Sequence, residues 1–145
     1  MRFDDPVARI MSVPVYSVHV DQPTSAARRM MREHRFHHVP VVHDGALVGM
    51  LSASDLLHLR FGDFGVQERF LDAVLDERYP IRELMVRDLV TIGPTEPIVR
   101  AAELLSDGRF HALPVVGEGR RLKGLVTSTD LVRFIVHLAA VDAGR

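Results

Sequence analysis

The chain has 145 residues, 47% of them hydrophobic and 26% charged, which is the size of one ordinary domain with enough apolar material for a core. The chain has 18 Lys and Arg residues and 19 Asp and Glu residues, which gives a net charge of −1. Such a chain has no overall positive field that would attract nucleic acid or an anionic membrane. The absence of cysteine excludes disulfides, thiolate catalysis and zinc–thiolate or iron–sulfur sites.

Neither a secretory signal nor a membrane span is expected. Asp4 and Asp5 stand where a secretory signal would carry positive charge followed by an apolar run. The most apolar stretch, residues 134–141, is much shorter than the roughly 20 residues that a membrane span requires. These features predict a soluble, cytoplasmic protein.

The sequence contains two copies of one unit. Residues 35–42 are repeated, with two differences, 74 positions later at residues 109–116. One inserted residue in a turn changes the offset to 75, which pairs Ser52 with Thr127 and Asp55 with Asp130. The repeat predicts three segments: a first repeat over 7–60, a hinge and connector over 61–79, and a second repeat over 80–141.

Each copy predicts the same elements in chain order. A short helical piece ends at Met11 or Met85, and a strand rich in β-branched residues follows over 13–18 or 89–92. A helix opens after Pro23 or Pro97, then a hairpin turns at 43–45 or 117–119, and a final helix carries Asp55 or Asp130. The inward face of the first of these helices is predicted to hold Ala26, Ala27, Met30 and Met31, or Ala101, Ala102, Leu104 and Leu105. The resulting β-α-β-β-α order, given twice, predicts two small α/β units that pack on one another, because about 60 residues rarely bury enough surface alone.

The connector is predicted to be a glycine hinge at 62–65 followed by an amphipathic helix. Its apolar face would hold Val66, Phe70, Ala73 and Val74. The simplest interpretation is a linker with no binding role.

A short motif closes each copy: Gly, two apolar residues, Ser or Thr, two further residues and Asp. It occupies 49–55 in the first copy and 124–130 in the second. A strand that ends at the hydroxyl residue would place the Asp in the first turn of a helix, where a carboxylate suits the positive end of the dipole. Alone, this pattern is an ordinary helix cap. Its repetition in register favours a nucleoside site, in which hydroxyl and helix amides face an anion or ribose oxygen and the carboxylate accepts hydrogen bonds from a vicinal diol.

Through this repeated motif, the chain resembles the CBS-domain proteins, in which two tandem CBS motifs form a pseudo-symmetric pair called a Bateman module. The resemblance covers about residues 7–141 and rests on Met-x-x-x-h-x-[ST], His-x-[VL]-Pro-Val-Val and Gly-h-h-[ST]-x-x-Asp, each present twice. It implies an α/β fold of two β-α-β-β-α CBS repeats packed sheet to sheet as one module. It also implies that Asp55 and Asp130 hold the ribose hydroxyls of an adenosine-type ligand, while Ser52 and Thr127 contact ribose or phosphate.

The resemblance further implies that adenine lies in a cleft between the repeats, so that each site draws on both. The site of Asp130 would use Met11, Pro14, Tyr16, Phe36 and His37 with Leu125, Thr127 and Thr129. The site of Asp55 would use Met85, Asp88, Val90, Phe110 and His111 with Met50, Ser52 and Ser54. Arg133 follows Asp130 by one helical turn and has His58 as its counterpart, so the Asp130 site is expected to favour the more phosphorylated ligand.

The histidines allow other interpretations. In the family, the position of His37 and His111 often faces ligand phosphates, and partial protonation near pH 6.5 would favour an anion there. Both could equally be strand-edge histidines satisfied by backbone. His34, His37 and His38 have a spacing that could bind a metal on a helix, but Pro40 disfavours helical geometry just before it, so no metal site is predicted.

The sequence lacks the phosphate-binding, nucleophile-elbow and metalloprotease motifs, so no catalysis and no catalytic cofactor are expected. The leading hypothesis is a free-standing CBS pair that binds AMP, ADP, ATP, S-adenosylmethionine or a similar ligand and signals to a partner protein. The alternative is a structural or protein-interaction module with vestigial clefts, and a small hydrolase is a third class.

A homodimer is also predicted, from the two final helices. In the second, Leu131, Ile135, Leu138 and Val141 can face the unit's own sheet, but Val132, Phe134, Val136, Ala139 and Ala140 leave almost no polar side. In the first, Leu56, Leu57, Leu59 and Phe61 are interrupted only by His58 and Arg60. A two-fold dimer would bury these apolar faces.

Overall fold

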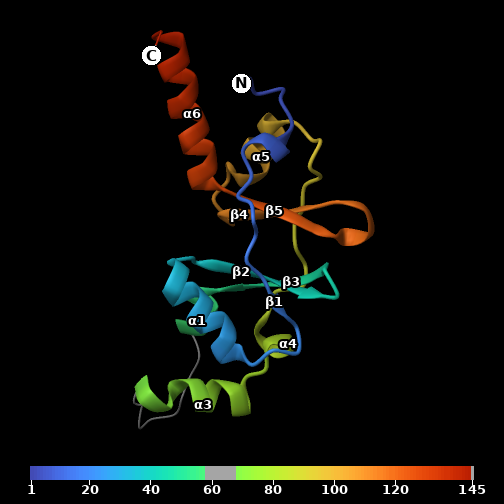
Figure 1. The fold of residues 1–145 in the computed structure, drawn as a ribbon, viewed down its shortest axis with the longest axis vertical. Coiled ribbons are helices and arrows are strands. Elements are labelled where there is room, and N and C mark those ends of the chain that lie inside the picture. The colour runs from blue at the N-terminus through green and yellow to red at the C-terminus, as the bar shows by residue number, and fades with distance from the viewer. Residues whose placement is uncertain (58–67, 145) are drawn as a thin grey trace. The chain divides into compact units, whose positions relative to one another are not determined.

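The computed structural model describes residues 1–57 and 68–144 and divides the chain into two compact units (Figure 1). The terminal unit consists of Met1–Val15 and Val90–Arg145, and the central unit of Tyr16–Leu89. The compact units therefore cut the chain differently from the sequence repeats, because the opening segment of each repeat belongs to the unit that holds the body of the other. The predicted hinge at 62–65, together with Val66 and His58, lies outside the described residues.

The central unit is built on a three-stranded sheet in the order β1-β2-β3. Its elements are β1 (Val18–His19), α1 (Thr24–His34), β2 (His38–His43), β3 (Ala46–Ser52), α2 (Ala53–Leu57), α3 (Glu68–Arg78) and α4 (Ile81–Leu84). Strand β1 is parallel to β2, and β2 and β3 form the predicted antiparallel hairpin. Asp44 and Gly45 make its two-residue turn with φ of 50° and 85°, the left-handed geometry that suits the twist of a hairpin.

The terminal unit repeats this plan with fewer strands. Its elements are η1 (Val7–Arg9), α5 (Ile98–Leu105), β4 (Ala112–Val116), η2 (Glu118–Arg120), β5 (Leu122–Thr127) and α6 (Ser128–Asp142). Strands β4 and β5 pair antiparallel, and Ile92 forms a single parallel bridge to Val115. The α/β class and the hairpins are thus confirmed, whereas sheet-to-sheet packing of the two repeats stays a prediction.

The predicted first strands are largely wrong. Of residues 13–18 only Val18 is in a strand, and of residues 89–92 only Ile92 makes a bridge. Ser12 instead pairs with Leu125 of β5, and Pro14 has no N–H with which to extend a ladder. The β-branched residues there indicated extended backbone, and here that backbone contains the boundaries of the two compact units along the chain rather than a full strand.

Each unit has its own apolar core. Ala27 and Met31 of α1 are buried in the central core, and Ala101 and Leu105 of α5 in the terminal core, as their helical spacing predicted. Val7 is fully buried against the terminal core although it lies 83 positions before the start of that unit's second segment at Val90. The N-terminal residues are therefore structural members of the terminal unit.

The connector helix α3 is docked on α1 rather than serving only as a linker. Both carboxylate oxygens of Asp76 accept hydrogen bonds from Ser25, one from its backbone N–H at 2.8 Å and one from its hydroxyl at 2.7 Å. Arg28 pairs with Asp72 at 2.9 Å. The predicted apolar face was wrong: Leu75 is the buried residue of α3, and Phe70 is 51% exposed. Ala73 is also exposed, so the buried face is turned from the predicted one.

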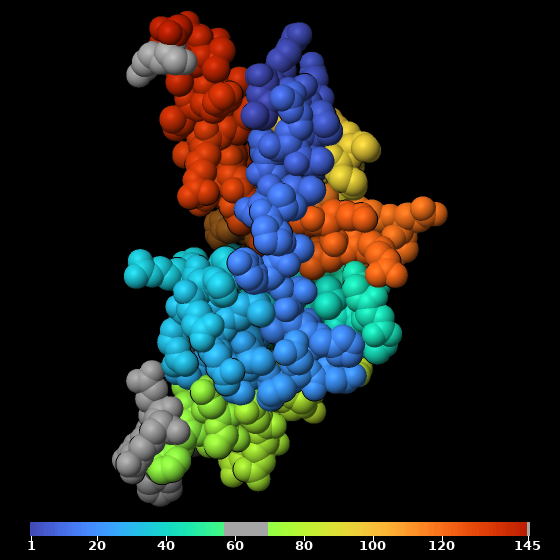
Figure 2. Space-filling model, in the orientation of Figure 1, coloured from blue at the N-terminus to red at the C-terminus, as the bar shows by residue number. Residues whose placement is uncertain are grey.

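Helix α6 shows a similar rotation. Phe134 is buried and its ring meets the Phe3 ring edge to face at 4.9 Å. Figure 2 shows the dark blue N-terminal residues lying against the red helix. Val132, Ile135, Val136 and Val141 are each more than half exposed. The prediction that Ile135 and Val141 face the core, and Phe134 the outside, is therefore wrong, although an exposed apolar side does exist. Among the described residues, no helix has the length and apolar content of a membrane span.

Candidate functional site

The closing motif of the second repeat forms a reciprocal cap at the start of α6. The Asp130 backbone N–H donates to Thr127 Oγ1 at 3.1 Å, and the Thr127 N–H donates to Asp130 Oδ2 at 2.9 Å. Asp130 is only 9% exposed. Its second oxygen, Oδ1, lies 4.0 Å from Nη1 of Arg133. The carboxylate therefore uses one oxygen for the helix cap and presents the other beside a cation.

The first repeat builds the same cap in the central unit. The Asp55 N–H donates to Ser52 Oγ at 3.0 Å, and the Ser52 N–H donates to Asp55 Oδ2 at 3.1 Å. None of the residues that the structure describes donates a hydrogen bond to Asp55 Oδ1. Two carboxylates, one in each unit, thus stand at helix N-termini with an acceptor oxygen available for a ligand hydroxyl.

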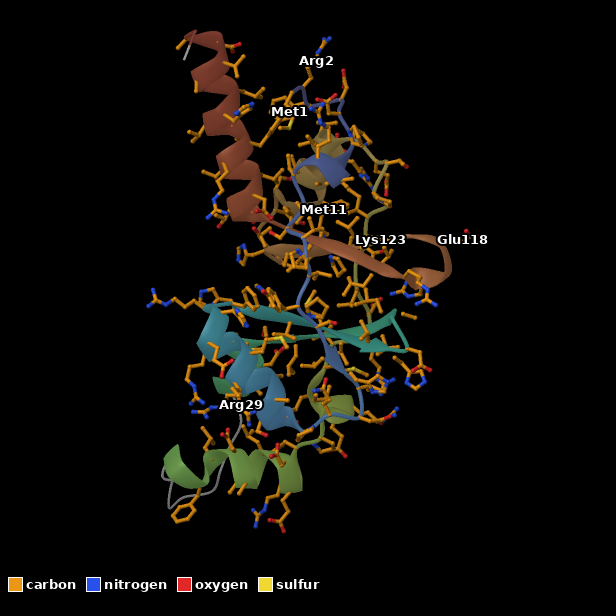
Figure 3. The ribbon with its side chains drawn as sticks, viewed as in Figure 1. Met1, Arg2, Met11, Arg29, Glu118 and Lys123 are labelled. Carbon is orange, nitrogen blue, oxygen red and sulfur yellow. The ribbon has the colours of Figure 1, made fainter. Side chains whose placement is uncertain are left out.

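A methionine lies over the glycine of each motif. Met11 covers Gly124, and Met85 covers Gly49: a Cβ added to these glycines would lie 2.6 Å and 2.5 Å from the respective sulfur atoms. Figure 3 shows Met11 beside β5, the strand that holds Gly124. The residue after each methionine also pairs with the motif strand in the same way in both units: Ser12 forms a β-bridge to Leu125, and Val86 forms one to Met50. Each unit therefore assembles one half-site from a Met segment and a Gly-to-Asp motif.

The close approach makes glycine necessary at these positions. Gly124→Ala should lower the free energy of unfolding by about 1–3 kcal/mol, because its Cβ would overlap Met11 Cγ at 2.9 Å and force the segment outward. Gly93→Ala is the matched control, since its Cβ would meet Glu96 Oε2 at an ordinary 3.4 Å. Denaturant titration of the two variants measures the difference, and equal stability would show that Met11 yields without cost.

The predicted site residues divide between the two units. Residues that the structure places together in the terminal half-site are Met11, Leu125, Thr127 and Asp130, with Pro14, Thr129 and Arg133 in the same unit. The central half-site holds Met85, Met50, Ser52 and Asp55, with Ser54 and Asp88 in the same unit. Tyr16, Phe36 and His37 belong to the central unit, while Val90, Phe110 and His111 belong to the terminal unit. Their predicted contribution to the opposite motif stays a prediction.

His37 and His111 occupy equivalent places in their own units. The His37 carbonyl accepts the N–H of Ala53 at 2.9 Å, and the His111 carbonyl accepts the N–H of Ser128 at 3.0 Å. Both side chains are exposed. The backbone of each histidine is thus fixed to the start of the final helix of its own unit, and the imidazole remains accessible to solvent.

Two features of the half-sites were not found from the sequence. Ser12 Oγ lies 3.5 Å from Asp130 Oδ2, a contact that its counterpart Val86 cannot make. The only sequence signal was its position after Met11. His34 stacks on Tyr16 at a centroid distance of 4.4 Å and on Phe36 at 5.2 Å, and the Tyr16 and Phe36 rings are 5.3 Å apart, so the three rings form one cluster. This arrangement gives the central unit an aromatic surface of the kind on which a nucleobase can stack.

The sequence model of the CBS domain matches this chain twice, over residues 7–62 and 81–137. The chain belongs to the CBS-domain family. The two matched stretches contain both half-sites, and their repetition is the repeat seen in the sequence.

Similar CBS sequences occur in longer proteins. The chain is 31% identical over 109 residues to the uncharacterized protein MJ1225 of Methanocaldococcus jannaschii, matching 74% of this chain and 39% of that protein. It is 32% identical over 130 residues to a homoserine O-acetyltransferase of Methanococcoides burtonii, matching 89% of this chain but 24% of the enzyme. A CBS domain-containing protein of Dictyostelium discoideum is 29% identical and matched over 92% of its length. The chain thus spans well under half of the first two relatives.

Solved CBS pairs have the same fold. The CBS domain pair of protein MJ0100, in complex with 5′-methylthioadenosine and S-adenosyl-L-methionine, is 27% identical with a TM-score of 0.71, covering 91% of this chain and 96% of that one. The CBS-pair protein CBSX2 from Arabidopsis thaliana is 25% identical with a TM-score of 0.76, covering 93% and 96%. These matches confirm the predicted CBS-pair fold class.

Proposed function

We propose that this CBS pair is a regulatory sensor that binds an adenosine-containing ligand at the Asp130 and Asp55 motifs and passes the bound state to a partner protein. The observation that carries the proposal is the duplicated cap, in which one carboxylate oxygen closes the helix and the other remains for a ligand. A carboxylate at a helix N-terminus can accept both hydroxyls of a ribose, while the hydroxyl residue and helix amides face its oxygens.

The similarity to the MJ0100 pair supports the ligand class. That protein was solved with 5′-methylthioadenosine and S-adenosyl-L-methionine, which share an adenosine group with AMP and ATP. In the present chain the guanidinium of Arg133 lies near Asp130 Oδ1. We infer that the Asp130 site favours ligands with more phosphate, because this cation adjoins the ribose acceptor.

The exposed side of α6 supports a second element of the proposal, which is assembly. Val132, Ile135 and Val136 form a continuous apolar strip of the kind that monomers rarely leave in water. We propose that a second copy of the chain covers it. An interaction module with vestigial clefts would share this strip but would lack ligand binding, so ligand binding distinguishes the two functions.

A thermal-shift titration tests the ligand class directly. S-adenosylmethionine, 5′-methylthioadenosine, AMP, ADP and ATP are each added to millimolar concentration, with GMP and GTP as base-specific controls. A bound ligand at a hundredfold excess over its dissociation constant should add about 2.7 kcal/mol to the free energy of unfolding. Stabilisation by adenosine compounds and not by guanosine compounds supports the proposal. No shift with any adenosine compound would leave the interaction module as the better description.

A further inference from the structure

Two histidines and an aspartate meet at one edge of the central sheet. His19 ends β1 and His43 ends β2, and these strands run parallel with His19 paired to Val42, so His43 follows the partner of His19 by one residue. The two imidazole centroids are 5.1 Å apart. Asp21 follows β1 by two residues, and one donor atom from each of the three side chains lies within 4.8 Å of the others. We call these three residues the His19 cluster.

The carboxylate of Asp21 also pairs with a cation, Arg82. Arg82 Nη2 donates to Asp21 Oδ1 at 2.7 Å, which leaves Oδ2 on the side of His19, 3.7 Å from Nδ1. The same hydrogen bond lowers the pKa of Asp21, so this carboxylate is ionised at neutral pH. One oxygen of Asp21 therefore accepts from Arg82, and the other faces the imidazole of His19.

A second carboxylate, that of Asp44, lies near both rings. Asp44 Oδ1 is 3.7 Å from His19 Nε2, and Asp44 Oδ2 is 3.6 Å from His43 Nε2. Metal-binding histidines commonly turn their second ring nitrogen toward a carboxylate, which fixes the tautomer and raises the basicity of the other nitrogen. Asp44 is placed to do this for His19, whose Nδ1 then faces Asp21.

The local charge suits a divalent cation. With neutral imidazoles, the carboxylates of Asp21 and Asp44 and the guanidinium of Arg82 sum to one negative charge. Metal binding at His19 Nδ1 would replace the hydrogen bond that this atom accepts from the Asp21 N–H at 3.2 Å. Tetrahedral Zn²⁺, with bonds of about 2.0–2.1 Å, needs donors roughly 3.3 Å apart. The side chains of His43 and Asp21 are exposed, so they can rotate to close that gap.

The cluster is not a requirement of the fold. The corresponding positions of the second repeat, 74 residues later, are Gly93, Thr95 and Gly117, of which none offers an imidazole or carboxylate. It is also separate from the ligand motif of its own unit. His43 and His38 mark opposite ends of β2, and His38 pairs with Ser52, so about 16 Å of strand separates the cluster from that motif.

We propose that His19, Asp21 and His43 form a binding site for a divalent transition-metal ion of the zinc class, with Asp44 and Arg82 orienting the ligands. Imidazole and carboxylate together suit Zn²⁺, and three protein ligands leave a position for water or for a group of a bound partner. This site does not depend on the adenosine proposal, because its residues and its place on the sheet are different.

Calorimetric titration of the full chain with ZnCl₂ tests the site. The wild-type chain should bind one Zn²⁺ per chain in a saturable manner. The double variant H19Q/H43Q should lose that event, and Asp44→Asn should weaken it about tenfold, as removal of an orienting partner does. His137→Gln is the matched control, since His137 is exposed on α6 in the other unit, and it should bind Zn²⁺ like the wild type.

Two results would overturn the site: no saturable Zn²⁺ binding by the wild type, or equal binding by H19Q/H43Q. Circular dichroism of H19Q/H43Q shows whether the variant is folded, and Zn²⁺-dependent thermal stabilisation gives a second readout for the wild type. Titrating the same variant with adenosine ligands separates the two proposals. Retained adenosine binding with lost Zn²⁺ binding supports two independent sites, whereas loss of both would show that the substitutions act through the fold and would count against the metal site.

Discussion

Asp130→Asn should weaken binding of an adenosine ligand at the terminal half-site by about ten- to a hundredfold. The carboxylate is expected to accept hydrogen bonds from the ribose, and a hydrogen bond to a charged group contributes about 1.5–3 kcal/mol. Asparagine retains an oxygen that can accept the Thr127 N–H, so the cap on α6 and the free energy of unfolding should change little. Calorimetry measures the affinity, and denaturant titration measures the stability.

Asparagine is a better test than alanine, for a structural reason. If Asp130 were an exposed carboxylate in an open cleft, its replacement by alanine would change the free energy of unfolding little. The structure shows instead that Asp130 is 9% exposed and takes part in the capping box of α6. Asp130→Ala would therefore remove about 1 kcal/mol of helix capping in addition to any ligand contact. Asp55→Asn is the matched variant of the other half-site. If the double variant D55N/D130N binds as tightly as the wild type, the assignment of the ribose to these carboxylates is wrong.

Val136→Asp should convert a dimer into monomers. Val136 is 63% exposed, and with Val132 and Ile135 it forms the apolar strip of α6. A charge placed in the centre of an aliphatic interface of more than roughly 1,000 Å² would be buried without a partner. Light scattering at micromolar concentration should give about twice the 16.3 kDa chain mass for the wild type and one chain mass for the variant.

The controls for assembly follow from burial. Val99 is 38% exposed at the start of α5 in the same unit, so Val99→Asp adds a charge outside the apolar strip of α6 and should remain dimeric. Phe134→Asp is unsuitable, because Phe134 is buried against Phe3 and its replacement would unfold the unit. A wild-type mass near that of one chain, or a dimeric Val136→Asp, would contradict the proposed assembly.

Local patterns predicted the parts of the fold that depend on local sequence. The helical spacing of Ala27 and Met31 gave the buried face of α1, and Asp44 with Gly45 marked the hairpin turn. The Ser-to-Asp and Thr-to-Asp spacing predicted both caps, because capping depends on residues three apart. These predictions agree with the structure because the interacting residues are close together along the chain.

Features that depend on distant pairing were missed. The buried faces of α3 and α6 differ from the predicted faces by a rotation of one or two residues. Leu75 and Phe134 are buried because of tertiary contacts, which the helical periodicity of the sequence does not reveal. Ser12 met Asp130 across 118 positions, and His19 met His43 through a parallel strand pair. No local pattern specifies such contacts. Of the two, only the contact between Ser12 and Asp130 lies in a region where the family resemblance suggested a site.

The opening segment of each repeat belongs to the compact unit that holds the body of the other repeat. This arrangement affects the order in which the units fold and the places where the chain can be cut. Val7 shares its core with Ile92 and Leu113, which are synthesised much later in the chain. Residues 1–15 must therefore wait until the second segment of their unit has been made, whereas Tyr16–Leu89 is one uninterrupted stretch that can collapse during synthesis. A fragment cut at the repeat boundary, residues 80–141, would lack Val7 and leave a hole in its own core, so the natural place to divide this protein is not where its sequence repeats.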